Sequence, residues 1–177
     1  MSFPDSDAPV ETVWKGKFIT AKKQGRWEYV SRARGIRAAV IFAVDDEGHL
    51  LLVEQYRVPL GRNCLELPAG LIGDGGDDEA DEIAAARELE EETGYRAERV
   101  ERLGFFFSSP GMVAEGFELV RAHGVTKVGN GGGTEHEEIE VHLVERERIA
   151  EFVAERRAAG VAVDTKMLLL LAGTFLG

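Results

Sequence analysis

Apolar and polar residues alternate through much of the first third of the chain, the pattern typical of strands with one buried face. The alternation, with short β-branched runs, predicts strands at residues 10–20, 26–34, 36–44 and 50–56. Lys-Lys-Gln-Gly at 22–25 is expected to form the turn between the first two strands, and Asp-Asp-Glu-Gly at 45–48 the turn of a hairpin. Residues 1–9 are polar and contain two prolines, so we expect a flexible tail there.

The pattern becomes helical after the glycine-rich stretch 73–78. That stretch predicts a loop, with Asp77 or Asp78 as the N-cap of a helix at 79–93. We expect the helix to bury one stripe of residues, formed by Ile83, Ala86 and Leu89. The acidic residues are then expected on the other side, and Gly94 is placed to end the helix as a C-terminal glycine.

The second half of the chain mixes further strands with helices. Its patterns predict strands at 100–107, 117–125 and 139–144, and helices at 146–159 and 164–175. Residues 129–133 hold four glycines in five positions, so we expect a flexible loop there. Antiparallel strands with a few helices predict an α+β fold in the form of an α/β/α sandwich. At 177 residues the chain is expected to form one domain with a sizeable core.

Charge and cysteine content narrow the classes of partner. The net charge of −11 argues against a surface that binds a nucleic acid polymer. Cys64 is the only cysteine in the sequence, which rules out an internal disulfide; we expect a small core residue in a reducing compartment. The first residues lack the pattern of a secretory leader and no apolar stretch is long enough for a membrane span, so we expect a cytoplasmic protein without a membrane partner.

Three acidic residues in the expected helix carry the strongest chemical signal. Glu88, Glu91 and Glu92 are spaced i, i+3 and i+4, which places them on one side of one helical turn. Carboxylates this close repel one another, so the spacing favours a bound hard cation, Mg²⁺ first and Mn²⁺ second. The alternative is a solvated acidic helix, against which the fixed glycines, the single Arg87 and the long gap after Glu79 argue.

From Gly73 to Tyr95 the sequence resembles the Nudix box, Gly-x5-Glu-x7-Arg-Glu-U-x-Glu-Glu-x-Gly-U, where U is an aliphatic or aromatic residue. The fixed positions are filled by Gly73, Glu79, Arg87, Glu88, Glu91, Glu92 and Gly94. The resemblance implies a hydrolase of nucleoside diphosphates linked to another group, with a mixed β-sheet between helices. It also implies that Glu88 and Glu92 are the principal metal ligands, that Glu91 is a third ligand with a catalytic role, and that Arg87 orients the box carboxylates.

The flanking segments resemble the ADP-ribose pyrophosphatase branch of that family. They are Gln55-Tyr56-Arg57, Leu65-Glu66-Leu67-Pro68-Ala69-Gly70 and Ser109-Pro110-Gly111. This resemblance implies that the backbone carbonyl of Ala69 is a further metal ligand and that Arg57 grips the diphosphate. A guanidinium suits that role because its planar fork donates two hydrogen bonds at once.

The same branch exchanges its first two strands across a homodimer. The resemblance therefore implies that residues 10–34 pair with a second subunit and that 35–177 form the Nudix hydrolase domain. It also implies that the adenine lies between the rings of Phe18 and Trp27, one of them from the partner subunit. Glu28 and Arg32 are then expected nearby. Core or interface packing is the alternative role for Trp27.

The general base is expected on the loop before residue 139, where Glu137 and Glu135 are both candidates. We expect hydrolysis of ADP-ribose to AMP and ribose 5-phosphate with two or three Mg²⁺ ions. A pyrophosphatase for another nucleotide sugar such as GDP-mannose, or a non-catalytic ADP-ribose-binding module, are the alternatives.

The sequence departs from the family pattern at two places. Gly70 lies three residues too early to be the first glycine of the box and Gly73 fills that place, which implies a three-residue insertion beside the metal site. This insertion could alter specificity for the terminal sugar. In addition, Glu115 is followed by Gly116, where the family often has a basic residue.

Overall fold

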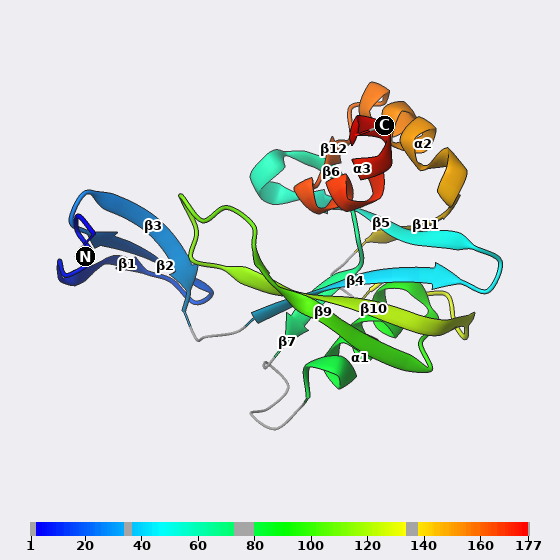
Figure 1. The fold of residues 1–177 in the computed structure, drawn as a ribbon, viewed down its shortest axis with the longest axis horizontal. Coiled ribbons are helices and arrows are strands. Elements are labelled where there is room, and N and C mark those ends of the chain that lie inside the picture. The colour runs from blue at the N-terminus through cyan, green and yellow to red at the C-terminus, as the bar shows by residue number, and fades with distance from the viewer. Residues whose placement is uncertain (1–2, 34–36, 73–79, 134–137, 177) are drawn as a thin grey trace.

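The computed structural model describes residues 3–33, 37–72, 80–133 and 138–176 and divides the strands between two sheets (Figure 1). A three-stranded sheet in the order β1-β2-β3 comes first in the chain. A nine-stranded sheet forms the body, with a central path in the order β12-β6-β5-β4-β10-β8. Strands β11, β7 and β9 are off this path and pair with β5, β4 and β10, respectively.

The N-terminal sheet consists of β1 (Val10–Lys15), β2 (Ile19–Gln24) and β3 (Trp27–Arg32), all antiparallel. The prediction of one strand over 10–20 is wrong, because the chain reverses at residues 16–18, where the Gly16 N–H donates to the Ile19 carbonyl (2.9 Å). The ring of Trp14 occupies the space that a side chain at Gly16 would need. The predicted turn at 22–25 also shifts, since β2 continues to Gln24 and the reversal falls at Gly25, whose φ of 56° suits glycine.

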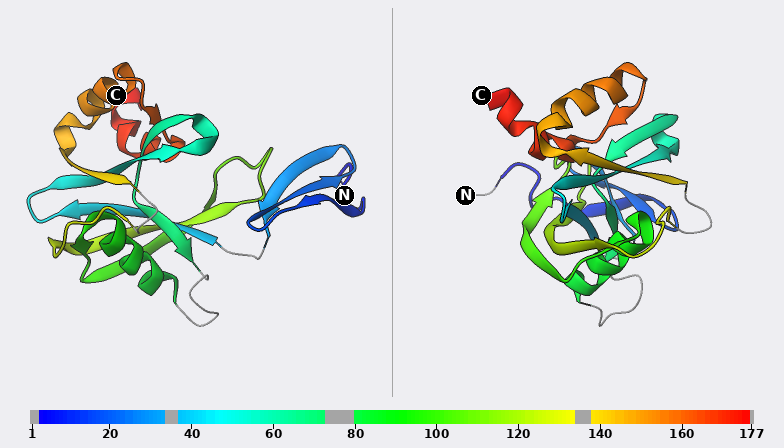
Figure 2. Two further views of the ribbon diagram at one scale, coloured as in Figure 1. Left: turned by 180° about the vertical axis from the view of Figure 1, so that it is seen from behind. Right: turned by 90° about the vertical axis from the view of Figure 1, so that its right-hand side faces the viewer.

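This small sheet stands to one side of the body (Figures 1 and 2). It meets the loop between β9 and β10 through hydrogen bonds from Val30 N–H to Met112 O (3.0 Å) and from Ala114 N–H to Val30 O (2.8 Å). The described part of the expected tail lies against the same sheet, because the Gln24 amide donates to the carbonyls of Ser6 and Ala8.

The body is a mixed sheet centred on β4 (Arg37–Asp45), as its continuous apolar run predicts for a strand covered on both faces. β4 pairs in parallel with β10 (Gly116–Lys127) and antiparallel with β7 (Ala69–Ile72) and β5 (His49–Arg57). The remaining strands are β6 (Arg62–Glu66), β8 (Tyr95–Arg96), β9 (Arg99–Phe107), β11 (Ile139–Glu145) and β12 (Ala162–Val163).

Helices cover both faces of this sheet, which confirms the predicted α/β/α sandwich (Figure 1). On one face, α1 (Asp81–Thr93) buries Leu89 against Ile41 of β4 and Leu51 of β5. On the other, α2 (Ile149–Ala158) and α3 (Leu168–Leu176) pack over Leu50 and Leu52. Three short 3₁₀ turns complete the set: η1 (Val58–Leu60), η2 (Arg146–Arg148) and η3 (Thr165–Met167).

The start and the buried stripe of α1 differ from the prediction. The cap position is Ala80, which has no side-chain cap bond, while Asp77 and Asp78 lie outside the described residues. Ile83 is 61% exposed, so its predicted place in the core is wrong. The buried stripe instead runs through Ala84, Ala85, Leu89 and Glu92, which places one of the box acids on the inward side.

The end of α1 is as predicted: Gly94 has a φ of 74° and its N–H donates to the Glu90 carbonyl (2.9 Å). Within the described part of the chain, none of the helices combines the length and the apolar character needed to cross a membrane.

Candidate active site

The body contains a cleft of about 770 Å³. Charged side chains from both halves of the chain line it, including Arg32 from the N-terminal sheet. Its walls come from α1, β5, β6, β7, the start of β10 and the η3 segment. Its charged lining residues are Arg32, Arg57, Glu66, Arg87, Glu88, Glu91, Glu92, Glu115, Asp164 and Lys166. All three acids singled out by their helical spacing therefore face one cavity, together with Ala69, Arg57 and Arg32.

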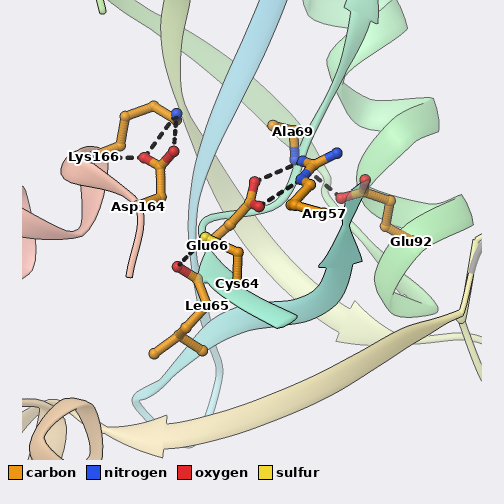
Figure 3. A network of polar contacts seen from close by, with 8 residues as sticks. All are labelled: Arg57, Cys64, Leu65, Glu66, Ala69, Glu92, Asp164 and Lys166. Atoms are coloured by element: carbon orange, nitrogen blue, oxygen red, sulfur yellow. Dashed lines mark hydrogen bonds and ion pairs between the residues drawn. The ribbon is translucent and has the colours of Figure 1, made fainter. Parts of the chain in front are cut away.

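Two of the box acids lie directly against the strand that carries the Ala69 carbonyl. Glu92 is 6% exposed, and its Oε2 accepts a hydrogen bond from the Ala69 N–H (3.0 Å; Figure 3). The Glu88 side chain lies over Gly70, where a methyl group would overlap it. A larger residue at this position of β7 would therefore have to displace the side chain of Glu88, a box acid that lines the cleft.

Arg87, which is expected to orient the box carboxylates, lies among them. Its Nη1 is 3.0 Å from Glu88 Oε1 and 3.2 Å from Glu91 Oε2. One guanidinium therefore holds carboxylates one and four residues further along the helix, which offsets part of their mutual repulsion.

The donor atoms fit a hard divalent cation in type, since three carboxylates and one backbone carbonyl offer oxygen only. In this conformation Glu91 is turned toward Arg87 and Glu92 toward the Ala69 N–H. Among the described residues, no three His, Cys, Asp or Glu side chains gather around one point that could hold a metal. The glycine and glutamate that open the box, Gly73 and Glu79, lie outside those residues.

The glycine loop at 129–133 is irregular, as expected, but it is fixed on the end of α1. The N–H groups of Gly132 and Gly133 donate to the carbonyls of Glu92 (2.8 Å) and Glu91 (3.1 Å). Gly131 has a φ of 67°, and a Cβ there would overlap the last turn of the helix. These bonds satisfy carbonyls that a helix end leaves unpaired, so the loop is held rather than free at this point. The base candidates Glu135 and Glu137 follow it and lie outside the described residues.

Arg57 is fixed by a partner that the sequence analysis did not single out. Its Nε and Nη2 donate to the two oxygens of Glu66 (2.6 and 2.7 Å), and Glu66 is buried (Figure 3). The hydrogen bonds to Glu66 raise the pKa of Arg57 and outweigh the opposing effect of burial. A fork-shaped pair of this kind fixes the plane of the guanidinium, so Arg57 presents its remaining donors to the cleft in one orientation.

The residues proposed to bind the adenine divide into two groups. Arg32 lines the cleft and donates from Nε to Glu115 (2.7 Å), which gives a role to an acid at one of the departures from the family pattern. Phe18 and Trp27 are 57% and 54% exposed on the N-terminal sheet. In the described structure these two rings and Glu28 are not among the residues that line the cleft of their own chain.

Cys64 is buried in the cleft wall on β6, which confirms the expected small core residue. Burial raises the pKa of its thiol to about 12, and the neighbouring Glu66 carboxylate adds to the shift. A thiol held neutral in this way is not a nucleophile at neutral pH.

Asp164 and Lys166 also line the cleft, and the sequence patterns did not predict them there. They enter the site because β12 pairs in parallel with β6, a contact between segments about a hundred residues apart in the sequence. No local motif in the sequence signals this pairing.

Comparison with known proteins places the chain in a family. The NUDIX domain model matches residues 34–163. The chain is similar to the methanol dehydrogenase activator of Bacillus methanolicus, with 38% identity over 68% of this chain and 64% of that protein. It is also similar to the ADP-ribose pyrophosphatase of Bacillus subtilis (strain 168), with 45% identity over 44% of this chain and 40% of that protein.

A third relative is the GDP-mannose pyrophosphatase of Cronobacter sakazakii, 34% identical over 78% of this chain and 72% of that protein. The chain is also similar in structure to an ADP compounds hydrolase whose crystal structure is known, with a TM-score of 0.69 over 96% of this chain and 92% of that one. The two sequences are 22% identical, so this similarity shows the fold alone. The matched stretch spans less than two thirds of the first two relatives. Because the family model covers most of the sequence, the chain belongs to the NUDIX domain family.

Proposed function

We propose that this chain hydrolyses the diphosphate of ADP-ribose, giving AMP and ribose 5-phosphate, with Mg²⁺ or Mn²⁺ as the metal. The observation that carries the proposal is that the box acids, Ala69 and the Arg57–Glu66 pair line one cleft of about 770 Å³. That volume lies in the range of small-molecule sites. Relatives that act as ADP-ribose and GDP-mannose pyrophosphatases support the substrate class, a nucleoside diphosphate joined to a sugar.

The cleft supplies the binding groups for such a substrate. Glu88, Glu91, Glu92 and the Ala69 carbonyl would hold two or three metal ions. When bound, these ions neutralise the diphosphate and lower the pKa of a coordinated water. The Arg57 guanidinium has five N–H donors, of which Glu66 takes two, and we assign the others to the phosphate oxygens.

The proton of the attacking water would pass to Glu135 or Glu137, the two loop acids named as base candidates. The glycine loop supports this role, since its hydrogen bonds to the carbonyls of Glu91 and Glu92 bring residue 133 to the end of α1. Phosphoryl chemistry of this kind depends on positioning and charge stabilisation, and needs no nucleophilic side chain.

We further propose a homodimer in which the N-terminal strands, residues 10–34, reach a second subunit. Every residue of β1 is exposed, including Val10, Val13 and Trp14. In the dimer, Phe18 and Trp27 would stack on the adenine, with Glu28 and Arg32 beside it. Light scattering of the purified protein tests the assembly, and a monomer at micromolar concentration would contradict it. The buried thiol of Cys64 supports placing the protein in the reducing cytoplasm.

A second candidate function is hydrolysis of another nucleotide sugar such as GDP-mannose. The relative from Cronobacter sakazakii favours it, because the similarity covers more of both chains than the similarity to the Bacillus subtilis enzyme. A non-catalytic ADP-ribose-binding module is a weaker alternative, since Glu88, Glu91 and Glu92 are all present in the box.

Replacement of one box acid tests the proposed metal role. Glu92→Gln keeps the shape of a buried side chain and can still accept the Ala69 N–H bond, so we expect it to fold normally and to lose turnover by orders of magnitude. Glu90→Gln, on the same helix but outside the cleft, is the matched control and should retain activity. Wild-type turnover by Glu92→Gln with Mg²⁺ would show that the proposed site is wrong.

A further inference from the structure

The Asp164–Lys166 pair forms a second polar group in the cleft, apart from the box acids and from Arg57. In the view of Figure 3, Glu66 lies between this pair and Arg57, with Glu92 beyond. The Lys166 Nζ is 2.7 Å from Asp164 Oδ1 and 2.8 Å from Oδ2. The two side chains are only 17% and 22% exposed, so the pair is part of the cleft wall and not a surface contact.

This pair is held in position by the backbone around it. The Asp164 N–H donates to the Leu65 carbonyl (3.0 Å), which fixes it to the strand that carries Glu66. The Asp164 carboxylate also caps η3 by accepting the Lys166 backbone N–H (2.7 Å). The ammonium lies over the Phe117 ring at 5.7 Å from the centroid, a cation–π contact that restrains it further.

The chemistry of the pair suits hydroxyl groups better than phosphate. A phosphate at Lys166 would lie beside the Asp164 carboxylate, and the two anions would repel each other. A neutralised pair still offers polar contacts: the Lys166 ammonium has three N–H donors, one of which bonds to Asp164 Oδ2 (2.8 Å), and the Asp164 carboxylate has about four acceptor sites. One donor and one acceptor placed side by side match two neighbouring hydroxyls of a sugar.

We propose that Asp164 and Lys166 form a subsite that binds the vicinal diol of a substrate sugar and thereby sets specificity. The inference rests on the proposed function, since it concerns the same cleft. ADP-ribose has vicinal hydroxyls on both of its sugars, the adenosine ribose and the terminal ribose. The chemistry of recognition is the same for both, so the experiment distinguishes the two sources.

The test compares Lys166→Met and Asp164→Asn with the wild type. Methionine keeps an apolar stem over Phe117, and asparagine keeps an oxygen for the η3 cap, so both variants should fold; thermal melting checks this. Lys127→Met, on the exposed end of β10 and outside the cleft, is the matched control. Should Asp164→Asn unfold, Lys166→Met alone carries the comparison.

The measurement is KM and kcat with Mg²⁺ for ADP-ribose, its 2′-deoxyadenosine analogue and the β-methyl ester of ADP, which lacks the terminal sugar. Loss of one charge-assisted hydrogen bond should raise KM for ADP-ribose about tenfold in Lys166→Met, with kcat within about twofold. The effect should vanish on the analogue that lacks the bound diol. Loss of the effect on the β-methyl ester identifies the terminal sugar, and loss on the 2′-deoxy analogue identifies the nucleoside.

Equal effects on all three compounds, no effect on any, or a fall in kcat at unchanged KM would overturn the proposal. The last result would mean that the pair acts in the transition state and does not bind the sugar of the substrate. If the wild type hydrolyses none of the three, the proposed function fails, and the inference is then measured by calorimetric titration with ADP-ribose. A Kd about tenfold weaker in Lys166→Met would support the subsite, and equal affinity or no binding to the wild type would overturn it.

Discussion

Glu66→Gln tests whether the orientation of Arg57 matters for turnover. Glu66 is buried and accepts both hydrogen bonds of the Arg57 fork, at 2.6 and 2.7 Å. Glutamine has almost the same shape but keeps only one acceptor oxygen and no charge, so one charge-assisted bond is lost. A hydrogen bond to a charged group contributes about 1.5–3 kcal/mol.

The lower end of that range determines the expected effect on catalysis. A loss of about 1.5 kcal/mol reduces the equilibrium ratio of held to released Arg57 conformers roughly tenfold, because 1.4 kcal/mol corresponds to a factor of ten at 25 °C. We therefore expect kcat/KM for ADP-ribose to fall by up to about tenfold, with the cost appearing mainly in KM. The assay is steady-state release of AMP at saturating Mg²⁺, with thermal melting to confirm folding.

The chain offers a matched control in Glu90→Gln. Glu90 forms the same fork-shaped pair with Arg96 (2.8 and 2.8 Å), but on an exposed face outside the cleft. That variant should keep kcat/KM within about twofold of the wild type. Arg57→Gln should lower activity by itself, and adding Glu66→Gln to it should have little further effect. Additive losses in the double variant, or wild-type activity in Glu66→Gln, would refute the positioning role.

Three further predictions concern the buried Glu54 carboxylate, the buried Cys64 thiol and Gly131 at the end of α1. Arg156→Met should lower the free energy of unfolding by about 3 kcal/mol in urea titrations, because it removes two hydrogen bonds (2.8 and 2.6 Å) from the buried Glu54 carboxylate. Burial raises the pKa of Glu54, but hydrogen bonds from Asn63 and Arg156 outweigh it and lower the pKa overall. The contribution of this network to the free energy of unfolding of the wild type should therefore be complete above about pH 4.3 and decline as the pH falls through the lower folded-state pKa of Glu54. The decline should be less steep in Arg156→Met, and identical curves of unfolding free energy against pH would contradict this. Cys64, with a thiol pKa of about 12, should resist iodoacetamide at pH 8 in the native protein and react in urea, so rapid native labelling would be inconsistent with its burial. Gly131→Ala should lower the melting temperature of the protein more than Gly61→Ala does. Both glycines have φ near 65°, so both substitutions share a strain of about 1 kcal/mol, but only at position 131 would the methyl group overlap the end of α1.

The local patterns of the sequence predicted the fold well where periodicity alone decides it. The strand predicted at 36–44 corresponds to β4 (Arg37–Asp45), which is covered on both faces, and Gly94 ended α1 because only a left-handed residue fits there. Ile83 was misplaced because Ile83, Ala86 and Leu89, spaced three residues apart, also fit a stripe along one side of the helix. The stripe that is buried runs beside it, through Ala84, Ala85 and Leu89. The reversal at 16–18 was missed because the residues on both sides of it have strand-like sequences.

The site was predictable to the extent that it lies in one segment. The spacing of Glu88, Glu91 and Glu92 is a property of a single helix, and the structure places all three in the cleft. Glu66, Asp164 and Lys166 could not be found in the same way, because their roles arise from pairing between β5, β6 and β12. The adenine-binding roles of Phe18 and Trp27 stay predictions, since they depend on a second subunit.

The proposed activity is tested by product analysis after incubation of the purified protein with Mg²⁺ and a panel of ADP-ribose, GDP-mannose, ADP-glucose, NADH and diadenosine polyphosphates. We expect ADP-ribose to be turned over fastest, the products to be AMP and ribose 5-phosphate, and EDTA to abolish the reaction. Faster hydrolysis of GDP-mannose would contradict the proposed substrate, and no release from any compound would contradict the proposed activity.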